Sequence, residues 1–254
     1  MLKKGFGNFI MNNDKEFLAT EPIGKLLLRL AIPTLAAQMI NMLYNIIDRI
    51  YIGHIPGSGA LALTGVGVCM PLIMIISAFA ALVGNGGAPR ASILMGKKDL
   101  DSAENIFGNC FTMQIIISVI LTLIMFFGNR TFLMAFGASE NTIEYAVSYM
   151  NIYSLGTIFV QLTLGMNAFI TAQGFAKTGM YSVLIGAVIN IILDPIFIFT
   201  CHMGVRGAAL ATIISQACSC IWVLSFLFGT RSTLRIKKQN LTLKAPVILP
   251  CLRS

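Results

Sequence analysis

An acidic residue lies within the most apolar run of this 254-residue sequence. The stretch VLIGAVINIILDPIFIFT, residues 183–200, contains Asn190, then Asp194 four residues later, then Pro195. A second acidic residue, Asp48, also lies within an apolar run, whereas the other acidic residues fall in polar stretches or at expected helix ends. An acidic side chain at the centre of a membrane helix costs about 2.5–3.5 kcal/mol. Two such residues therefore indicate a polar interior or a bound cation.

The types and depths of four polar side chains predict a cation site. Asn190 and Asp194 lie one helical turn apart and share a face. Asp48, on the first apolar run, and Thr212, on the sixth, lie at a similar expected depth, with Thr212 ~10 Å from the outer end of its run. Such oxygen ligands suit Na⁺, and paired buried carboxyl groups suit a proton. A structural hydrogen bond, or a side chain that reaches the membrane interface, is the alternative interpretation.

Two prolines lie inside apolar runs and are expected to kink helices. Pro195 removes a backbone donor and leaves the carbonyl oxygen one turn earlier without a partner, so the bend there can respond to the charge on Asp194. Pro33, in LAIPTLAAQ, is the second expected kink. Prolines are also tolerated in membrane helices for structural reasons alone.

A stripe of polar side chains is expected on the first apolar run. Its members are spaced three, four and three residues apart, which places them on one helix face: Gln38, Asn41, Asn45 and Asp48. The stripe predicts either a water-filled pathway or hydrogen bonds between helices. Gln161 and Gln216, on later runs, are expected to contribute in the same way.

The elements that must position these residues are membrane-spanning helices. The composition is 56% hydrophobic and 11% charged, with a mean hydropathy of +0.81, whereas soluble domains have about 25% charged residues. Because lipid cannot satisfy open backbone groups, each apolar run should be a helix. The fold class is therefore all-α membrane protein with six transmembrane helices. The expected spans are 25–51, 61–84, 104–127, 145–171, 179–199 and 206–228.

The spans divide the chain into three parts. Residues 1–22 are expected to form a cytoplasmic N-terminal segment, residues 23–229 a six-helix transmembrane lobe, and residues 230–254 a basic cytoplasmic tail. Gly84, Gly86, Gly87 and Pro89 are expected to end the second span. The connector after this span, PRASILMGKKDLDSAENIF, is expected to hold a short amphipathic helix on the cytoplasmic face.

The distribution of basic residues predicts the orientation. With the N-terminus in the cytoplasm, 15 of the 18 Lys and Arg residues lie on the cytoplasmic side, and only Arg49, Arg130 and Arg206 lie outside. This bias predicts a multi-pass plasma-membrane protein with both termini in the cytoplasm. Because the net charge of +8 arises between apolar runs, it indicates topology and a lipid bilayer rather than nucleic acid as a partner.

Three stretches resemble the multidrug and toxic compound extrusion (MATE) transporters over about Pro22 to Lys244: NIIDRIYIGHIPGSGALALTGVG, NIILDPIFIF and GVRGAALATIISQ. The resemblance implies a twelve-helix, two-lobed exporter of organic cations and amphipathic drugs that is driven by Na⁺ or H⁺. It implies a coupling-cation site at Asp48, Asn190, Asp194 and Thr212, with Tyr153 nearby. The bent first helix of the family matches Pro33.

The expected function is cation-coupled antiport of amphipathic or cationic drugs by alternating access, with Na⁺ or H⁺ as coupling ion and no other cofactor. The chain matches only the first lobe and the start of a linker. A fragment truncated before a second lobe is the favoured interpretation, and a half-transporter that forms a homodimer is an alternative.

Three other classes of protein share some of these features. A lipid-linked oligosaccharide flippase of the same superfamily would line its cavity with basic residues, and the spans contain almost none. An intramembrane aspartyl protease would carry Tyr-Asp and Gly-x-Gly-Asp, but Asp48 follows Ile47 and Asp194 follows Leu193. A purely structural membrane subunit would show no response to cations.

Overall fold

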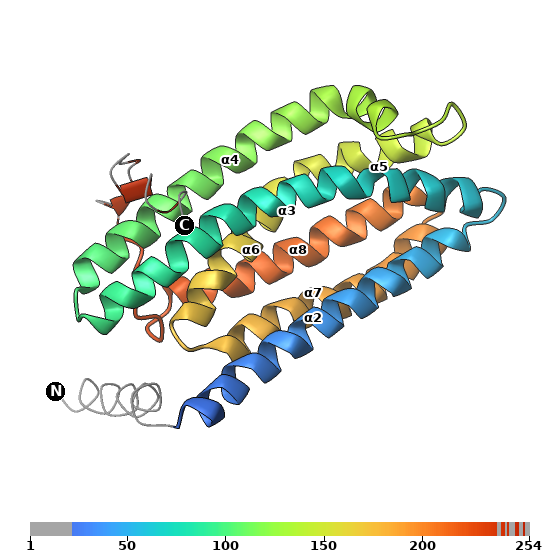
Figure 1. The fold of residues 1–254 in the computed structure, drawn as a ribbon. Helices are drawn as coiled ribbons and strands as arrows, with labels where there is room; N and C mark the ends of the chain where they lie inside the picture. Colours follow the sequence, from blue (N-terminus) through green and yellow to red (C-terminus); the bar gives the residue numbers. More distant parts are fainter. Residues whose placement is uncertain (1–21, 238–239, 242, 244–246, 249–250, 252–254) are drawn as a thin grey trace.

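The protein is an elongated bundle of helices in a computed structural model that describes residues 22–237, 240–241, 243, 247–248 and 251 (Figure 1). The expected N-terminal segment, residues 1–21, lies outside the described residues, as does much of the expected tail. The helices are α2 (Ile23–Gly53), α3 (Gly59–Gly96), α4 (Leu100–Ala135), α5 (Ile143–Leu155), α6 (Thr157–Ala172), α7 (Ala176–Pro195), η1 (Ile196–Thr200) and α8 (Val205–Phe228).

The helices confirm an all-α membrane fold. Within the described residues, five helices are long and apolar enough to cross a bilayer, and the pair α5 and α6 makes a sixth span if it is counted as one. The outer faces carry exposed large apolar side chains, such as Leu35, Met42 and Phe127. Such a surface is compatible with hydrocarbon as the surrounding solvent.

The expected end of the second span is wrong. Helix α3 continues through Gly84, Gly86, Gly87 and Pro89 and ends at Gly96. The glycines mark close helix packing, because a Cβ on Gly84 would lie 2.9 Å from the carbonyl oxygen of Gly165 on α6. Close packing over this length outweighs the modest helix propensity of glycine.

The expected amphipathic helix in the next connector is also absent from the described chain. Only residues 97–99 separate α3 from α4. Lys98 adopts a positive φ of 64° and makes the turn. Asp99 then caps α4, because its side chain accepts a hydrogen bond from the backbone N–H of Ser102 at 3.1 Å. Hydrogen bonds from the Ser102 side chain and backbone lower the pKa of Asp99.

The expected single span at 145–171 is two helices. α5 and α6 meet at Gly156 with a bend of 59°. A Cβ on Gly156 would lie 2.6 Å from the side chain of Ile213 on α8. The bend is therefore located where a residue without a side chain lets α8 approach the corner.

The helices form two unequal groups around the site. Helix α2 packs mainly against α7 and buries only Pro33, Asp48 and Ile52. The remaining helices supply most of two apolar core clusters, and α2 contributes Ile52 to one of them. Buried amides reinforce this second group, because Gln114 of α4 and Gln161 of α6 donate to the α3 carbonyl oxygens of Ala80 and Ile76 at 3.0 and 2.7 Å.

Candidate cation site and cavity

The carboxyl groups of Asp48 and Asp194 meet between α2 and α7. The two side chains interact directly, and the residues are 8% and 0% exposed. The Asn190 amide nitrogen donates to Asp194 Oδ1 at 3.2 Å. Asn190 and Asp194 therefore share a helix face, as their spacing predicts, and α2 brings Asp48 to them.

Three oxygen atoms of this cluster have no hydrogen-bond partner among the residues that the structure describes: Asp48 Oδ1, Asp194 Oδ2 and Asn190 Oδ1. Two ionised carboxylates in contact repel each other, and a shared proton or a bound cation removes the repulsion. The unpaired oxygens are hard ligands of the kind that Na⁺ takes. The described residues contain no group of three or more His, Cys, Asp or Glu side chains that could hold a metal ion. The oxygens of the two carboxyl groups and of the Asn190 amide are the ones that would hold a cation here.

The backbone next to Asp194 is irregular. α7 ends at Pro195, and residues 196–200 continue as a π-helical turn. Proline lacks the N–H that an α-helix needs at this position, and single π turns occur often at functional sites. The helix type therefore changes at Pro195, while Ala176–Thr200 remains one continuous span. By contrast, Pro33 lies within an α2 that is continuous from Ile23 to Gly53.

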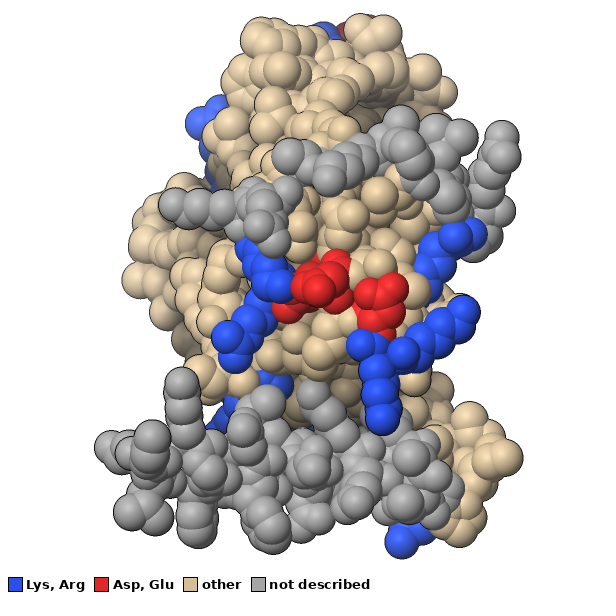
Figure 2. Space-filling view, turned by 90° about the vertical axis from the view of Figure 1, so that its left-hand side faces the viewer, with Lys and Arg blue, Asp and Glu red and all other residues tan. Residues whose placement is uncertain are grey.

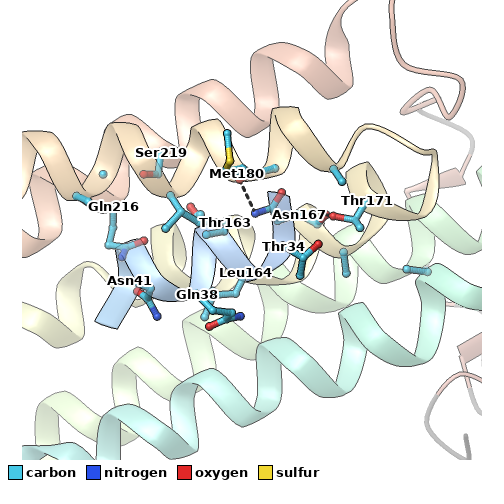
Figure 3. Close-up of a pocket in the computed structure, with 18 of the residues that line it drawn as sticks. Thr34, Gln38, Asn41, Thr163, Leu164, Asn167, Thr171, Met180, Gln216 and Ser219 are labelled. Atoms are coloured by element: carbon cyan, nitrogen blue, oxygen red, sulfur yellow. Dashed lines mark hydrogen bonds between the residues drawn. The ribbon is translucent and has the colours of Figure 1, made fainter. Parts of the chain in front are cut away.

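A cavity of about 630 Å³ lies between the α2–α7 pair and helices α3, α6 and α8 (Figure 3). Asn190, Thr212 and Tyr44 line it, which connects it with the carboxyl pair. Figure 3 shows Asn167 of α6 among the lining residues, and its amide donates to Gly179 and Ser182 of α7 at 3.3 and 3.1 Å. The described residues that line the cavity include no charged side chain.

Only part of the predicted polar stripe on α2 lines this cavity. Gln38 and Asn41 of α2 line it, as does Gln216 of α8. Asn45 does not, and its amide donates to the carbonyl oxygen of Asn41 at 2.6 Å. Gln161 is also not a lining residue, because its amide is used in the buried contact with α3.

Thr212 lines the cavity and makes a hydrogen bond within its own helix. Its hydroxyl donates to the Ala208 carbonyl oxygen at 2.9 Å, and it lies beside Tyr149. Tyr153 is buried and stacks on Tyr149, with ring centroids 5.9 Å apart. Tyr149, which also has Asp48 as an electrostatic neighbour, thus links Thr212 and Tyr153 to the site.

Two tyrosines of the site were missed in the sequence. Tyr44 lies on α2 one turn before Asp48 and lines the cavity. Tyr149 lies on α5 one turn before Tyr153, and Asp48 is among its electrostatic neighbours. The four-residue spacing of each tyrosine from a predicted site residue was the available signal.

This fold and site define one lobe of a polytopic membrane transporter, and comparison with known proteins agrees. The family model MatE matches residues 33–196. The chain therefore belongs to the MatE family, whose members are transporters and not enzymes. This membership sets aside the intramembrane protease alternative.

Curated relatives and solved structures match this chain with similar identity and over a similar share of its length. The Multidrug export protein MepA of Staphylococcus haemolyticus is 28% identical over 212 residues, which is 84% of this chain and 46% of MepA. A structure of MATE in the bent conformation superposes with a TM-score of 0.85 at 28% identity, covering 94% of this chain and 53% of that one. A MOP superfamily transporter from Pyrococcus furiosus gives a TM-score of 0.82 at 28% identity, with 90% and 50% covered. The chain spans about half the length of these relatives.

Proposed function

We propose that this chain is the cation-coupling lobe of an exporter of amphipathic and cationic drugs, driven by inward Na⁺ or H⁺. The observation that carries the proposal is the buried contact between Asp48 and Asp194 beside a cavity of about 630 Å³. The relatives named as multidrug export proteins support the drug-export part. Both termini are placed in the cytoplasm, as the distribution of basic residues predicts.

The coupling arises because Asp48 and Asp194 are buried side by side and repel each other when both are ionised. A bound proton or Na⁺ supplies the positive charge that lets both carboxyl groups remain buried together. Asp48 is the main buried polar contact of α2, so the charge state of the pair determines how firmly α2 is held against α7. Asp194 directly precedes Pro195 and the π turn, where the backbone can change conformation at low cost.

The cavity links this change to the drug. Asn190 contacts Asp194 and also lines the cavity, as do Gln38 and Asn41 of α2. A movement of α2 relative to α7 therefore changes the cavity wall. Drug and cation compete because each binds more tightly to a different position of α2. Solved relatives are described as bent and straight conformations of MATE, which supports a proposal that involves two conformations.

A flippase for lipid-linked oligosaccharides is the second candidate. Such a protein would need positive charge for the pyrophosphate of its substrate. No Lys or Arg is present among the described residues that line the cavity. The cavity therefore favours cationic or neutral amphipathic substrates.

The test is equilibrium binding by the chain in lipid nanodiscs. A fluorescent lipophilic cation reports drug binding by anisotropy. Trp222, the single tryptophan, reports the position of α7 because its indole donates to the Thr178 carbonyl oxygen at 3.2 Å. We expect Na⁺ or a fall in pH to weaken dye binding and to change Trp222 emission. Asp194→Asn should abolish both cation effects.

The matched control is Glu144→Gln, which removes an exposed carboxylate that pairs with Arg130 at 2.7 Å far from the cavity. This variant should respond to cations like the unmodified chain. If Asp194→Asn keeps the full response to Na⁺ and pH, the coupling role of the carboxyl pair is wrong. If the chain responds to cations but does not bind the dye, the drug-binding part alone fails.

A further inference from the structure

The segment after α8, residues 230–237, is part of the lobe although it is not helical. Leu234 is 0% exposed and belongs to the core cluster that contains Ala103, Phe107 and Leu227. Ile236 packs against the same cluster. The side chains of Leu234 and Ile236 therefore attach this docked segment, residues 230–237, to the apolar core.

Gln173, at the C-terminal end of α6, holds the backbone of the docked segment. Its side-chain oxygen accepts hydrogen bonds from Ser232 Oγ at 3.1 Å, from the Thr233 N–H at 2.7 Å and from the Leu234 N–H at 3.2 Å. Its amide nitrogen donates to the Phe169 carbonyl oxygen at 3.2 Å. Gln173 is 4% exposed, so these bonds are shielded from water.

Glu104, in the second turn of α4, holds the far end of the docked segment. Its Oε1 accepts from the Arg235 N–H at 3.3 Å, and its Oε2 pairs with Lys237 Nζ at 2.5 Å. Lys237 also pairs with Asp101 at 3.2 Å. These contacts, with Glu104 the larger influence, raise the pKa of Lys237. Figure 2 shows the acidic side chains of this end gathered between Lys and Arg.

A glycine on the same face of α4 makes room for the chain beyond this segment. Asp101, Glu104 and Gly108 are spaced three and four residues apart, so they form one stripe. A Cβ on Gly108 would lie 2.6 Å from the Asn240 carbonyl oxygen. The α4 surface thus fits the outgoing chain both at Lys237 and at Asn240.

We infer that the docked segment is a built-in anchor that fixes the chain leaving α8 to the ends of α4 and α6. Gln173 and Glu104 are its positioning residues. The contacts named above come from α4, α8 and the C-terminal end of α6, and none of these contacts comes from α2 or α7. The anchor therefore ties the outgoing chain to α4, α6 and α8 rather than to α2 or α7. This inference does not depend on the proposed coupling.

Hydrogen–deuterium exchange of the chain in nanodiscs tests the anchor. We expect the N–H groups of Thr233, Leu234 and Arg235 to exchange slowly, since each donates to a shielded side chain. Gln173→Leu removes the acceptor of two of them and should speed their exchange about tenfold or more. Glu104→Ala should do the same for Arg235. Glu144→Gln, at the opposite end of the bundle, should change nothing there.

A second variant guards against a general loss of folding. Gly108→Ala removes no hydrogen bond and crowds only the outgoing chain, so trypsin should cleave faster after Arg235. Gly67→Ala is the control, because its Cβ would meet nothing within 4 Å. Exchange at unprotected rates in the unmodified chain would overturn the anchor. So would cleavage rates that are equal for Gly108→Ala and Gly67→Ala together with unchanged exchange in Gln173→Leu.

Discussion

At the scale of single residues, small and amide side chains determine how closely the helices pack. Gly84 and Gly165 bring the backbones of α3 and α6 together, with only 3.1 Å between an ideal Cβ on Gly84 and the Gly165 Cα. Gln161 then donates across the same interface to Ile76. In lipid, close packing and buried hydrogen bonds replace the hydrophobic effect as the main attraction between helices. These residues therefore stabilise the side of the cavity opposite α2.

Gly84→Ala should destabilise the lobe, because the added methyl group meets backbone atoms that cannot rotate away. We expect the free energy of unfolding to fall by about 1–3 kcal/mol, measured by denaturant-induced unfolding in detergent micelles. Gly67→Ala, on an open part of the same helix, should be neutral or slightly stabilising. Equal stability of the two variants would show that the α3–α6 contact relaxes freely.

At the scale of elements, the lobe combines long helices with local breaks. α3 runs unbroken through four residues that usually end helices, whereas α5 and α6 break at Gly156 and α7 changes to a π turn at Pro195. Each break lies next to a close helix contact or to the candidate site. The Gly156 corner receives Ile213 of α8, and the Pro195 break adjoins the carboxyl pair.

The close approach of Ile213 to Gly156 predicts that substitutions at these two positions affect stability in a coupled way. Gly156→Ala should push on Ile213 and lower stability by about 1–3 kcal/mol. Ile213→Ala removes the opposing side chain, so the double variant should be more stable than the sum of the two single effects predicts, by at least about 0.5 kcal/mol. A double-mutant cycle of unfolding free energies measures this. Simple additivity would place the cause of the bend elsewhere than in the Gly156–Ile213 contact.

At the scale of the whole molecule, the cavity lies between the pair formed by α2 and α7 and helices α3, α6 and α8, which contribute to two apolar cores. The docked segment and the connectors at residues 97–99 and 173–175 lie at the end of the bundle from which α2 begins (Figure 1). The connector that contains Cys201 lies at the opposite end. The proposed orientation therefore places Cys201 outside the cell.

Cys201 offers a direct test of this orientation. It is exposed, whereas Cys69, Cys110 and Cys220 are buried. A membrane-impermeant maleimide added to intact cells should label the unmodified chain, and Cys201→Ser should lose most of the label. Labelling that requires opened cells would show the reverse orientation and contradict the placement of both termini in the cytoplasm.

The sequence by itself determined the class of fold and most of the polar residues at the site. A bilayer permits only closed backbone hydrogen bonding, so apolar runs had to be helices, and Asp48 and Asp194 stood out because buried acids are costly there. Tertiary structure alone decided which role each glycine and amide takes. Gly84 could end a helix or admit a neighbour, and Gln161 could face a cavity or an α3 carbonyl. The choice depends on the helix opposite, whose position is set by packing between residues far apart in the chain.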